Sequence, residues 1–285
     1  MLFRSHEFSG ALNGMLRVRT FCQDDSHIFV TPDQIEEEIT SALKLIDHVY
    51  RTFGFNYDIE LSTRPEDYMG EEALWDKAEG SLKNVLTKLG YSFSINEGDG
   101  AFYGPKIDIH IKDALKRSHQ CATVQLDFQM PEKFDLHYID ENNQKVRPVV
   151  IHRAVFGSID RFLGILIEHF AGAFPVWLSP LQVSVIPVSY KHHGQYCEEI
   201  RNRLKEEGLR VECDLREEKL GYKIREAQMK KVPYVLVVGD KEQENQAVNV
   251  RSYGGQNSQE EKLEEFIVRV KQQIKDKSLN LSHND

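Results

Sequence analysis

The chain lacks the features that would place it in or across a membrane. No apolar run among its 285 residues approaches the roughly 18 residues that a membrane-spanning helix needs. The first residues carry no hydrophobic core segment, so we expect no secretory signal peptide. Its four cysteines show neither CxxC nor framework spacing, which favours a reducing compartment. We therefore predict a cytoplasmic protein without membrane contact.

A strong excess of basic charge is also missing. The 36 Lys and Arg residues against 45 Asp and Glu residues give a formal net charge of −9. That balance argues against a protein that wraps nucleic acid over its whole surface, although a local basic patch stays compatible with it. Repeats are absent, and low complexity is confined to a polar tail after about residue 275. The length suits one large or two ordinary domains.

The segment 17–27 is the most informative one that is present. We predict that it belongs to a strand over 17–30, in which alternate side chains share a face. Arginine forks suit phosphate, an aromatic ring suits a base, and acid plus imidazole suit a small polar ligand or a metal ion. A charged sheet edge with one core phenylalanine is the alternative. The face in question carries Arg17, Arg19, Phe21, Gln23, Asp25 and His27.

Apolar spacing predicts an α+β organisation for the first part of the chain, up to residue 174. Thr31 is expected to cap a helix that runs to about residue 50, with Pro32 at its first position. Further helices are expected over 76–89 and 159–170. Hairpin-like strands are expected over 59–63, 107–111 and 123–128.

The pattern changes at the segment 174–180, which contains two prolines and a tryptophan. Beyond it, strands alternate with helices, which is typical of a compact α/β domain with a largely parallel sheet. The expected strands cover 183–188, 210–214, 234–238 and 247–253, and the expected helices cover 195–207, 221–230 and 259–274.

Several further motifs could carry chemistry. His27 and His152 are candidate zinc ligands, but each could equally be a half-buried histidine bonded to its neighbours. The glycine-rich turn 98–106 ends in Lys106 and could cradle phosphate, although it lacks the GxxxxGK[ST] pattern and could be a simple hairpin. The helix start at 157–161 could aim its N-terminus and Arg161 at an anion. Basic residues over 216–231 form either a solvated face or a surface for RNA phosphate.

Taken together, these motifs resemble threonyl-tRNA synthetase, a class II aminoacyl-tRNA synthetase of bacterial type. Residues 4–27 resemble motif 2 of the class, and residues 157–161 resemble motif 3. The resemblance implies a partial class II catalytic domain over 1–174 and an anticodon-binding α/β domain over 175–285. The matching segments, in the family's order, are 7–12, 17–29, 100–106, 120–128, 151–154, 157–161, 214–216 and 223–226.

The resemblance also implies a role for each candidate residue, with ATP and Mg²⁺, threonine and tRNA(Thr) as the molecules bound. Arg17, Lys106 and Arg161 would be catalytic, and adenine would lie between Phe21 and Arg161. His27 and His152 would be two of three ligands of a Zn²⁺ ion that threonine chelates. ATP would contact Glu7, Arg17, Phe21, Gln120, Thr123 and Arg161, and threonine would contact Gln23, Asp25, Tyr103, Lys106 and Gln125. The anticodon would contact Glu217, Arg225, Lys231, Glu242 and Arg251.

Three departures from the family pattern bear on activity. Motif 1, which builds the family's homodimer interface, and the cysteine that is the third zinc ligand would both precede residue 1. Ser5 stands where motif 2 normally has an arginine that grips the α-phosphate and the amino-acid carboxylate. Arg4 is one residue away, but a one-residue shift turns a strand side chain to the other face. The family's editing domain has no counterpart either.

We therefore expect a threonine–tRNA ligase that activates threonine with ATP and transfers it to tRNA(Thr). Loss of a charged transition-state contact at Ser5 could cost several kcal/mol, so this chain alone should be weakly active or inactive and should bind zinc poorly. The alternative is a non-catalytic tRNA-binding or regulatory paralogue that keeps the fold. A natural short chain and a truncated longer one both fit the sequence.

Overall fold

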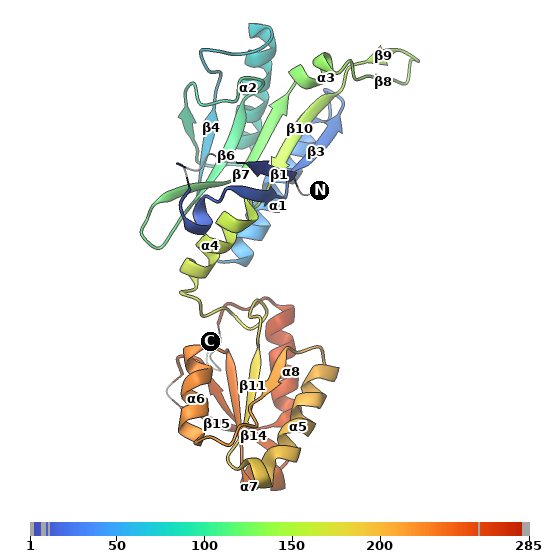
Figure 1. Cartoon of the computed structure of the whole chain (residues 1–285). Coiled ribbons are helices and arrows are strands. Elements are labelled where there is room, and N and C mark those ends of the chain that lie inside the picture. The colour runs from blue at the N-terminus through green and yellow to red at the C-terminus, as the bar shows by residue number, and fades with distance from the viewer. Residues whose placement is uncertain (1–2, 7–9, 11, 256, 281–285) are drawn as a thin grey trace. The chain divides into compact units, whose positions relative to one another are not determined.

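The computed structural model of the protein describes residues 3–6, 10, 12–255 and 257–280 (Figure 1). Its contacts divide the chain into two units, Met1–His169 and Phe170–Asp285. Among the described residues, no helix is both long and apolar enough to cross a membrane.

The first unit is built on a six-stranded sheet in the order β3-β10-β7-β6-β4-β5. Neighbouring strands run antiparallel except for β4 and β5, and two two-stranded sheets, β1-β2 and β8-β9, accompany it. The strands are β1 (Phe3–His6), β2 (Thr20–Gln23), β3 (Ser26–Val30), β4 (Tyr57–Ser62), β5 (Ser94–Asn96), β6 (Lys106–Lys112), β7 (Ser118–Asp127), β8 (Tyr138–Ile139), β9 (Lys145–Val146) and β10 (Val149–Ala154). The helices are the 3-10 helix η2 (Gly14–Leu16), α1 (Ile35–Thr52), α2 (Glu72–Lys88), α3 (Gln129–Lys133) and α4 (Ile159–His169).

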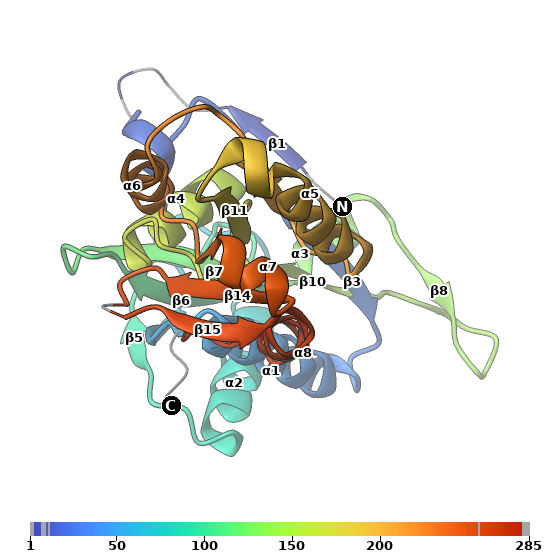
Figure 2. The ribbon, with the colours of Figure 1, turned by 90° about the horizontal axis from the view of Figure 1, so that it is seen from below.

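The two faces of this sheet differ in chemistry. On β6, Ile107, Ile109 and Ile111 are buried on one face, while Lys106 and Asp108 alternate with them and point to the other. Helix α1 contacts β7 and β10 and buries the apolar stripe that the sequence predicted, including Ile39 and Ile46. The β8–β9 hairpin projects from its own unit in both views (Figures 1 and 2). Because helix α1 packs against the apolar face of this sheet, the polar face of β6 is the one available to a site.

Two sequence expectations for the first unit are wrong in detail. The single strand over 17–30 is two strands, β2 and β3, which belong to different sheets and are separated at Asp24. The side chain of Asp24 accepts three backbone N–H groups from residues 155–157, and that distant contact breaks the strand. Helix α1 begins at Ile35 rather than after Thr31, because Thr31 bonds Asp33 and Gln34 within a preceding turn.

The second unit carries a five-stranded sheet in the order β12-β11-β13-β14-β15. Its strands are β11 (Val183–Pro187), β12 (Val211–Cys213), β13 (Tyr234–Val238), β14 (Ala247–Ser252) and β15 (Gln259–Lys262). Its helices are α5 (Tyr190–Glu206), α6 (Leu220–Met229), α7 (Asp240–Glu244) and α8 (Leu263–Lys275).

Alternation along β13 sends its residues into two separate cores. Tyr234, Leu236 and Val238 join one apolar cluster, whereas Val235 and Val237 join the other. The predicted parallel pairing holds for β12, β11 and β13, but β14 and β15 run antiparallel. The helix expected over 259–274 starts only at Leu263, because residues 259–262 pair with β14 as a strand.

Candidate active site

One cavity of about 400 Å³ on the polar face of the first unit gathers most of the predicted substrate residues. It contains residues from β2 and from the turn between β2 and β3, from the glycine-rich turn, from β7 and β10 and from the start of α4. The predicted residues in its lining are Phe21, Gln23, Asp25, Tyr103, Lys106, Gln120, Thr123, Gln125, His152 and Arg161. Cys121, Ala154, Gly157 and Ser158 complete the lining.

Two rows of paired residues across the sheet explain why these side chains meet. Residues that are Cα partners on neighbouring strands project from the same face. The first row runs from β3 to β4 through His27, His152, Gln125, Lys106 and Ser62. The second row runs from β10 to β4 through Ala154, Thr123, Asp108 and Glu60.

A β-bulge on β7 brings Gln120 to the same face as Thr123. Strict alternation would place residues three apart on opposite faces. Pairing passes from Ile109 opposite Ala122 directly to His110 opposite Gln120, so Cys121 is the extra residue. The carbonyl of Gln120 then accepts a hydrogen bond from Arg161 Nη1 at 3.0 Å. Burial raises the pKa of the Cys121 thiol to about 12, so it stays protonated at neutral pH.

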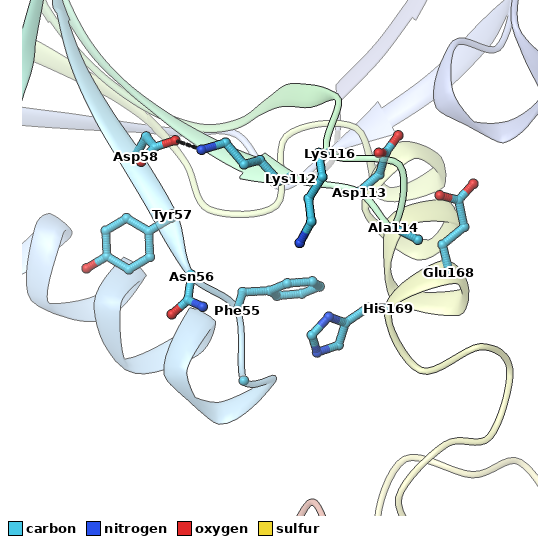
Figure 3. A pocket seen from close by; sticks show the side chains of 11 residues that line it. Phe55, Asn56, Tyr57, Asp58, Lys112, Asp113, Ala114, Lys116, Glu168 and His169 are labelled. Carbon is cyan, nitrogen blue, oxygen red and sulfur yellow. Dashed lines mark ion pairs between the residues drawn. The ribbon is translucent and has the colours of Figure 1, made fainter.

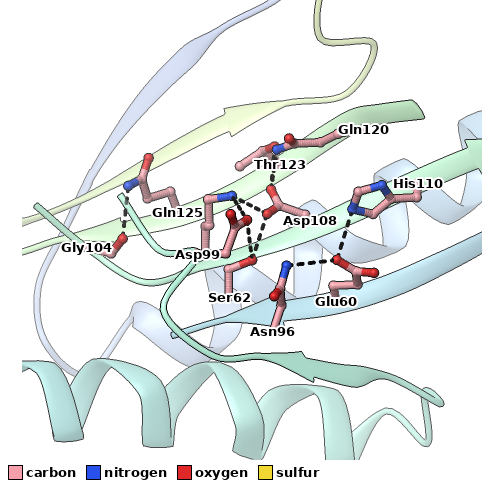
Figure 4. Close-up of polar contacts among 11 residues, drawn as sticks. Glu60, Ser62, Asn96, Asp99, Gly104, Asp108, His110, Gln120, Thr123 and Gln125 are labelled. Atoms are coloured by element: carbon pink, nitrogen blue, oxygen red, sulfur yellow. Dashed lines mark hydrogen bonds and ion pairs between the residues drawn. The ribbon is translucent and has the colours of Figure 1, made fainter. Parts of the chain in front are cut away.

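A network of hydrogen bonds converges on Asp108 beneath the cavity (Figure 4). Its Oδ2 accepts from Lys106 Nζ and, at 2.9 Å, from Ser62 Oγ. Its Oδ1 accepts from Gln120 Nε2 and, at 3.0 Å, from Thr123 Oγ1. Burial by itself would lower the pKa of Lys106, but its hydrogen bonds and ion pairs with Asp108 and Asp99 outweigh burial and raise it. Lys106 therefore stays a cation.

The segment that leads into α4 is tied to the turn between β2 and β3, which follows Gln23 and contains Asp25. Asp24 accepts hydrogen bonds from the N–H groups of Val155 at 2.8 Å, Phe156 at 2.9 Å and Gly157 at 3.1 Å. Gly157 has φ of +67°, and a Cβ there would lie 2.4 Å from the carbonyl oxygen of Cys121. Only glycine fits this close approach without a shift of backbone.

His27 and His152 lie side by side, but only His152 lines the cavity, and His27 is exposed. They are Cα partners, and their ring centroids are 4.5 Å apart. His152 Nε2 lies 2.9 Å from Oδ2 of the fully buried Asp127, whose Oδ1 accepts from the N–H groups that begin α3. A carboxylate that orients an imidazole is common behind metal ligands. In the described part of the chain, no group of three or more His, Cys, Asp and Glu side chains is placed to hold a metal ion.

Four residues near the N-terminal end also bear on the predicted site. Arg17 is exposed, pairs through its backbone with Asn13 and does not line the cavity. Glu7, expected beside adenine, lies outside the described residues. In the β1–β2 register, Ser5 is opposite Phe21 and Arg4 is opposite Cys22. Ser5, rather than Arg4, is therefore the backbone partner of a residue that lines the cavity.

A second cavity, of about 440 Å³, lies at the far end of β6 and contains none of the predicted residues (Figure 3). Lys112 pairs with Asp58 across it at 2.7 Å. The buried Asp113 accepts from the backbone and side chain of Arg117, from Leu115 N–H and from His119. Lys112, Asp58 and Asp113 therefore have partners within the fold.

The five anticodon candidates do not form one cluster in the second unit. Glu217 follows β12 and Glu242 follows β13, at the carboxyl ends of parallel strands. Arg251 is the partner of Val235 near the amino end of β13, which Lys231 precedes. Glu242 accepts from Gly239 N–H at 3.0 Å, and Lys231 Nζ donates to the carbonyl of Ala171. Arg225 is exposed on α6.

Sequence reasoning missed three acids that organise the site: Asp24, Asp108 and Asp127. Asp24 and Asp127 stand inside motifs that were quoted, Gln-Asp-Asp and Gln-Leu-Asp. Asp24 falls on the opposite face of the predicted strand from Gln23 and Asp25, whereas Asp127 alternates onto the same face as Thr123 and Gln125, which was an available signal. Asp108 follows Lys106 by two residues, and that spacing on a strand was the available signal.

Comparison with known families agrees with this arrangement. Residues 1–170 match the tRNA synthetase class II core domain (G, H, P, S and T), and residues 182–273 match the anticodon binding domain. The chain therefore belongs to the class II tRNA synthetases.

Within that class, its similarity is to the threonine-specific members. Threonine–tRNA ligase 2 of Bacillus subtilis (strain 168) is 65% identical over 96% of this chain, and the threonine–tRNA ligase of Acetivibrio thermocellus is 58% identical over 97%. The chain spans 43% of the length of each of these relatives. The crystal structure of the RNA binding domain of threonyl-tRNA synthetase from Cryptosporidium parvum Iowa II aligns with a TM-score of 0.89 at 42% identity, over 99% of this chain and 70% of that one.

Proposed function

We propose that this chain carries the ATP and threonine site, together with the anticodon-binding unit, of a threonine–tRNA ligase. The observation that supports the proposal is the gathering of nine predicted ATP and threonine residues, together with the predicted zinc ligand His152, around one cavity. The reaction would join the carboxylate of threonine to the α-phosphate of ATP with release of pyrophosphate. The aminoacyl group would then pass to the terminal ribose of tRNA(Thr).

The nucleotide half of the site would be formed by Phe21, Arg161 and the bulged segment of β7. Arg161 Nε donates to the carbonyl of Leu16 at 2.9 Å, and Arg161 Nη1 donates to that of Gln120, so two backbone acceptors fix the guanidinium. A fixed planar cation and a phenyl ring that line the same cavity suit an adenine between them. Gln120 and Thr123 would contact the nucleotide, with Arg17 and Glu7 in the roles that the resemblance implies.

The amino-acid half would be formed by Gln23, Asp25, Tyr103, Lys106 and Gln125. Burial raises the pKa of Tyr103, with the negative charges of Asp127 and Asp25 adding to the effect, so its phenol stays protonated. The cation of Lys106 suits the carboxylate of threonine and the negative charge that develops at phosphate. A pocket that must hydrogen-bond a hydroxyl rejects valine, which has the shape of threonine without that group.

His27 and His152 fit two positions of a zinc site that a further ligand outside this chain would complete. When bound, the ion would supply a Lewis acid for the amino and hydroxyl groups of threonine. Asp127 would hold the His152 ring in place. The weak zinc binding expected of this chain, the family's homodimer and the cytoplasmic location stay predictions.

Binding of a threonyl-adenylate analogue would test the proposal directly. Calorimetry with threonyl, seryl and valyl sulfamoyl-adenosines should show binding of the first two and binding of the valyl compound weaker by about 10²-fold or more. Equal affinity for threonyl and valyl compounds, or no binding of any of them, would contradict the proposed site.

The substitution Ser5→Arg would test the proposed cause of low activity. Restoring the cation should raise threonine-dependent ATP–pyrophosphate exchange by about 10²-fold, the usual scale for one charged transition-state contact. Asn84→Arg, an exposed position on α2, provides a matched control that should leave the rate unchanged. If Ser5→Arg has no effect while the chain binds tRNA(Thr) tightly, the non-catalytic tRNA-binding paralogue becomes the better description.

A further inference from the structure

Asp108 differs from the other polar residues of the site because it does not line the cavity. Only 1% of its surface is exposed, and its side chain lies on the polar face of β6 among the side chains that donate to it. Four donors approach its two oxygens: the Lys106 ammonium, the Ser62 hydroxyl, the Gln120 amide and the Thr123 hydroxyl. A carboxylate offers about four lone-pair positions, so its capacity to accept hydrogen bonds is filled.

Three of these donors are side chains that reach the cavity. Lys106 belongs to the proposed amino-acid half, whereas Gln120 and Thr123 belong to the proposed nucleotide half. Gln120 Nε2 also lies 2.9 Å from Thr123 Oγ1, so the nucleotide-side pair is linked within itself as well as to the carboxylate. One buried group therefore contacts both halves of the site.

We propose that Asp108 is a positioning residue that couples the two halves of the cavity by holding Lys106, Gln120 and Thr123 together. This inference takes the identity of the two ligands from the proposed function. The hydrogen-bond network around Asp108 does not depend on that proposal. Its carboxylate keeps the charge of Lys106 in place and sets the rotamers of Gln120 and Thr123 before any ligand binds. A change on the nucleotide side then alters the amino-acid side, because both depend on the same two oxygens.

The substitution Asp108→Asn is the direct test in this chain. An amide group cannot accept from donors on both of its ends, so one pair of contacts must break. Without any ligand, the rate of reductive methylation of Lys106, read by mass spectrometry, should rise about tenfold, because loss of one opposite charge lowers a lysine pKa by about one unit or more. The affinities for threonine and for ATP, measured separately, should each fall by about tenfold or more.

Asp113→Asn is the matched control. Asp113 is also buried and also accepts four hydrogen bonds, but it lies at the other end of β6, away from the site. It should lower the melting temperature comparably and leave the reactivity of Lys106 and both affinities unchanged. If the two variants behave alike, Asp108 has only a structural role and the proposal is overturned. Asp108 would instead be a metal ligand if its loss changed only the magnesium dependence of ATP binding.

A second variant keeps the proposal testable if Asp108→Asn does not fold. Thr123→Val keeps the shape of the side chain and removes one hydroxyl donor from the nucleotide half. Coupling predicts a rise of about twofold or more in the methylation rate of Lys106, with Lys112 as an internal reference, although Thr123 does not contact Lys106. An unchanged rate would overturn the coupling. If the wild-type chain binds neither threonine nor ATP, the proposed function fails, while the reactivity of Lys106 still decides the role of Asp108.

Discussion

In the first unit, β6 and β7 bury polar groups on one face, where Asp108 and Gln125 are bonded around a cavity. In the second unit, β11 and β13 are buried along their whole length and send apolar side chains into a core on each face. The sequence of a strand that is covered on both faces is a nearly continuous run of apolar residues. The first sheet is thus part of the proposed site, whereas the second is a support whose candidate contacts lie on helices, strand ends and loops.

This difference determines which substitutions can separate stability from binding. In the first unit, a change in the site also removes structural contacts. In the second unit, the interior can be damaged without touching an anticodon candidate, and exposed candidates such as Arg225 can be changed without touching the interior. Four substitutions test this contrast, in order of decreasing expected effect.

Gly104→Ala should have the largest effect. A Cβ at Gly104 would lie 1.8 Å from the carbonyl oxygen of Leu126, which is backbone and cannot turn aside. We expect a loss of about 4 kcal/mol or more in the free energy of unfolding, measured by urea titration. Gly80→Ala is the matched control, because nothing lies within 4 Å of its Cβ in α2 and helix propensity favours alanine there. A mild effect at Gly104 would show that β7 can move.

Leu236→Ala should damage the second unit by a cavity rather than a clash. Leu236 is fully buried in the larger core of that unit, and such substitutions cost about 3 kcal/mol. Below its lowered melting temperature, the variant should keep its affinity for tRNA(Thr), because none of the candidate contacts belongs to that core. Val268→Ala, at a position that is 68% exposed, should change the stability by less than about 0.5 kcal/mol. Loss of RNA affinity in folded Leu236→Ala would remove the contrast between the units.

Asp113→Asn should reduce stability in a pH-dependent way. Burial alone would raise the pKa of Asp113, but hydrogen bonds from His119 and Arg117 lower it well below its usual range. The carboxylate therefore stabilises the fold above its unfolded pKa of about 4, and this contribution is lost as the pH falls toward the folded value. We expect a loss of about 2 kcal/mol at pH 7 and a smaller difference from wild type near pH 3, measured by thermal melts. An equal loss of stability at both pH values would show that the ionised carboxylate of Asp113 is not the source of the stabilisation.

Arg225→Ala should have the smallest effect on stability. Its side chain is exposed on α6, so the free energy of unfolding should change by less than about 0.5 kcal/mol. If Arg225 contacts RNA phosphate, the affinity for tRNA(Thr) should fall, and the slope of log affinity against log salt should decrease by about one. Lys205→Ala, an exposed position on α5 outside the predicted set, should leave the slope unchanged.

Local patterns predicted most of the elements and many of the residues of the site. Periodicity placed α1 and α4 and strands β6 and β13 near their observed bounds, because their apolar spacing reflects one buried face or a doubly covered strand. The resemblance supplied the residue types of the cavity. Neither source could supply the pairing register that places His27, His152, Gln125 and Lys106 in one row, because register depends on contacts between distant segments.

The errors have the same physical origin. Alternation predicted one strand over 17–30, but the carboxylate of Asp24 is held by residues 155–157, which lie far away in sequence. Residues 259–262 have charged side chains suited to a helix start, yet an open strand edge on β14 pairs with them. The two-residue spacing of Asp108 from Lys106 was the one sequence signal of its role, because the donors that surround it come from three strands.

The bulge at Cys121 makes the site sensitive to the number of residues in β7 as well as to their identity. Every residue from Gln120 back to Ser118 faces its observed side only because one extra residue follows Gln120. Loss of the bulge at unchanged length would leave all the chemical groups in the chain but turn Gln120 toward the helix-covered face. Deletion of Cys121 would instead restore regular alternation with Gln120 on the cavity face, so the two residues that now separate Gln120 from Thr123 make the bulge necessary.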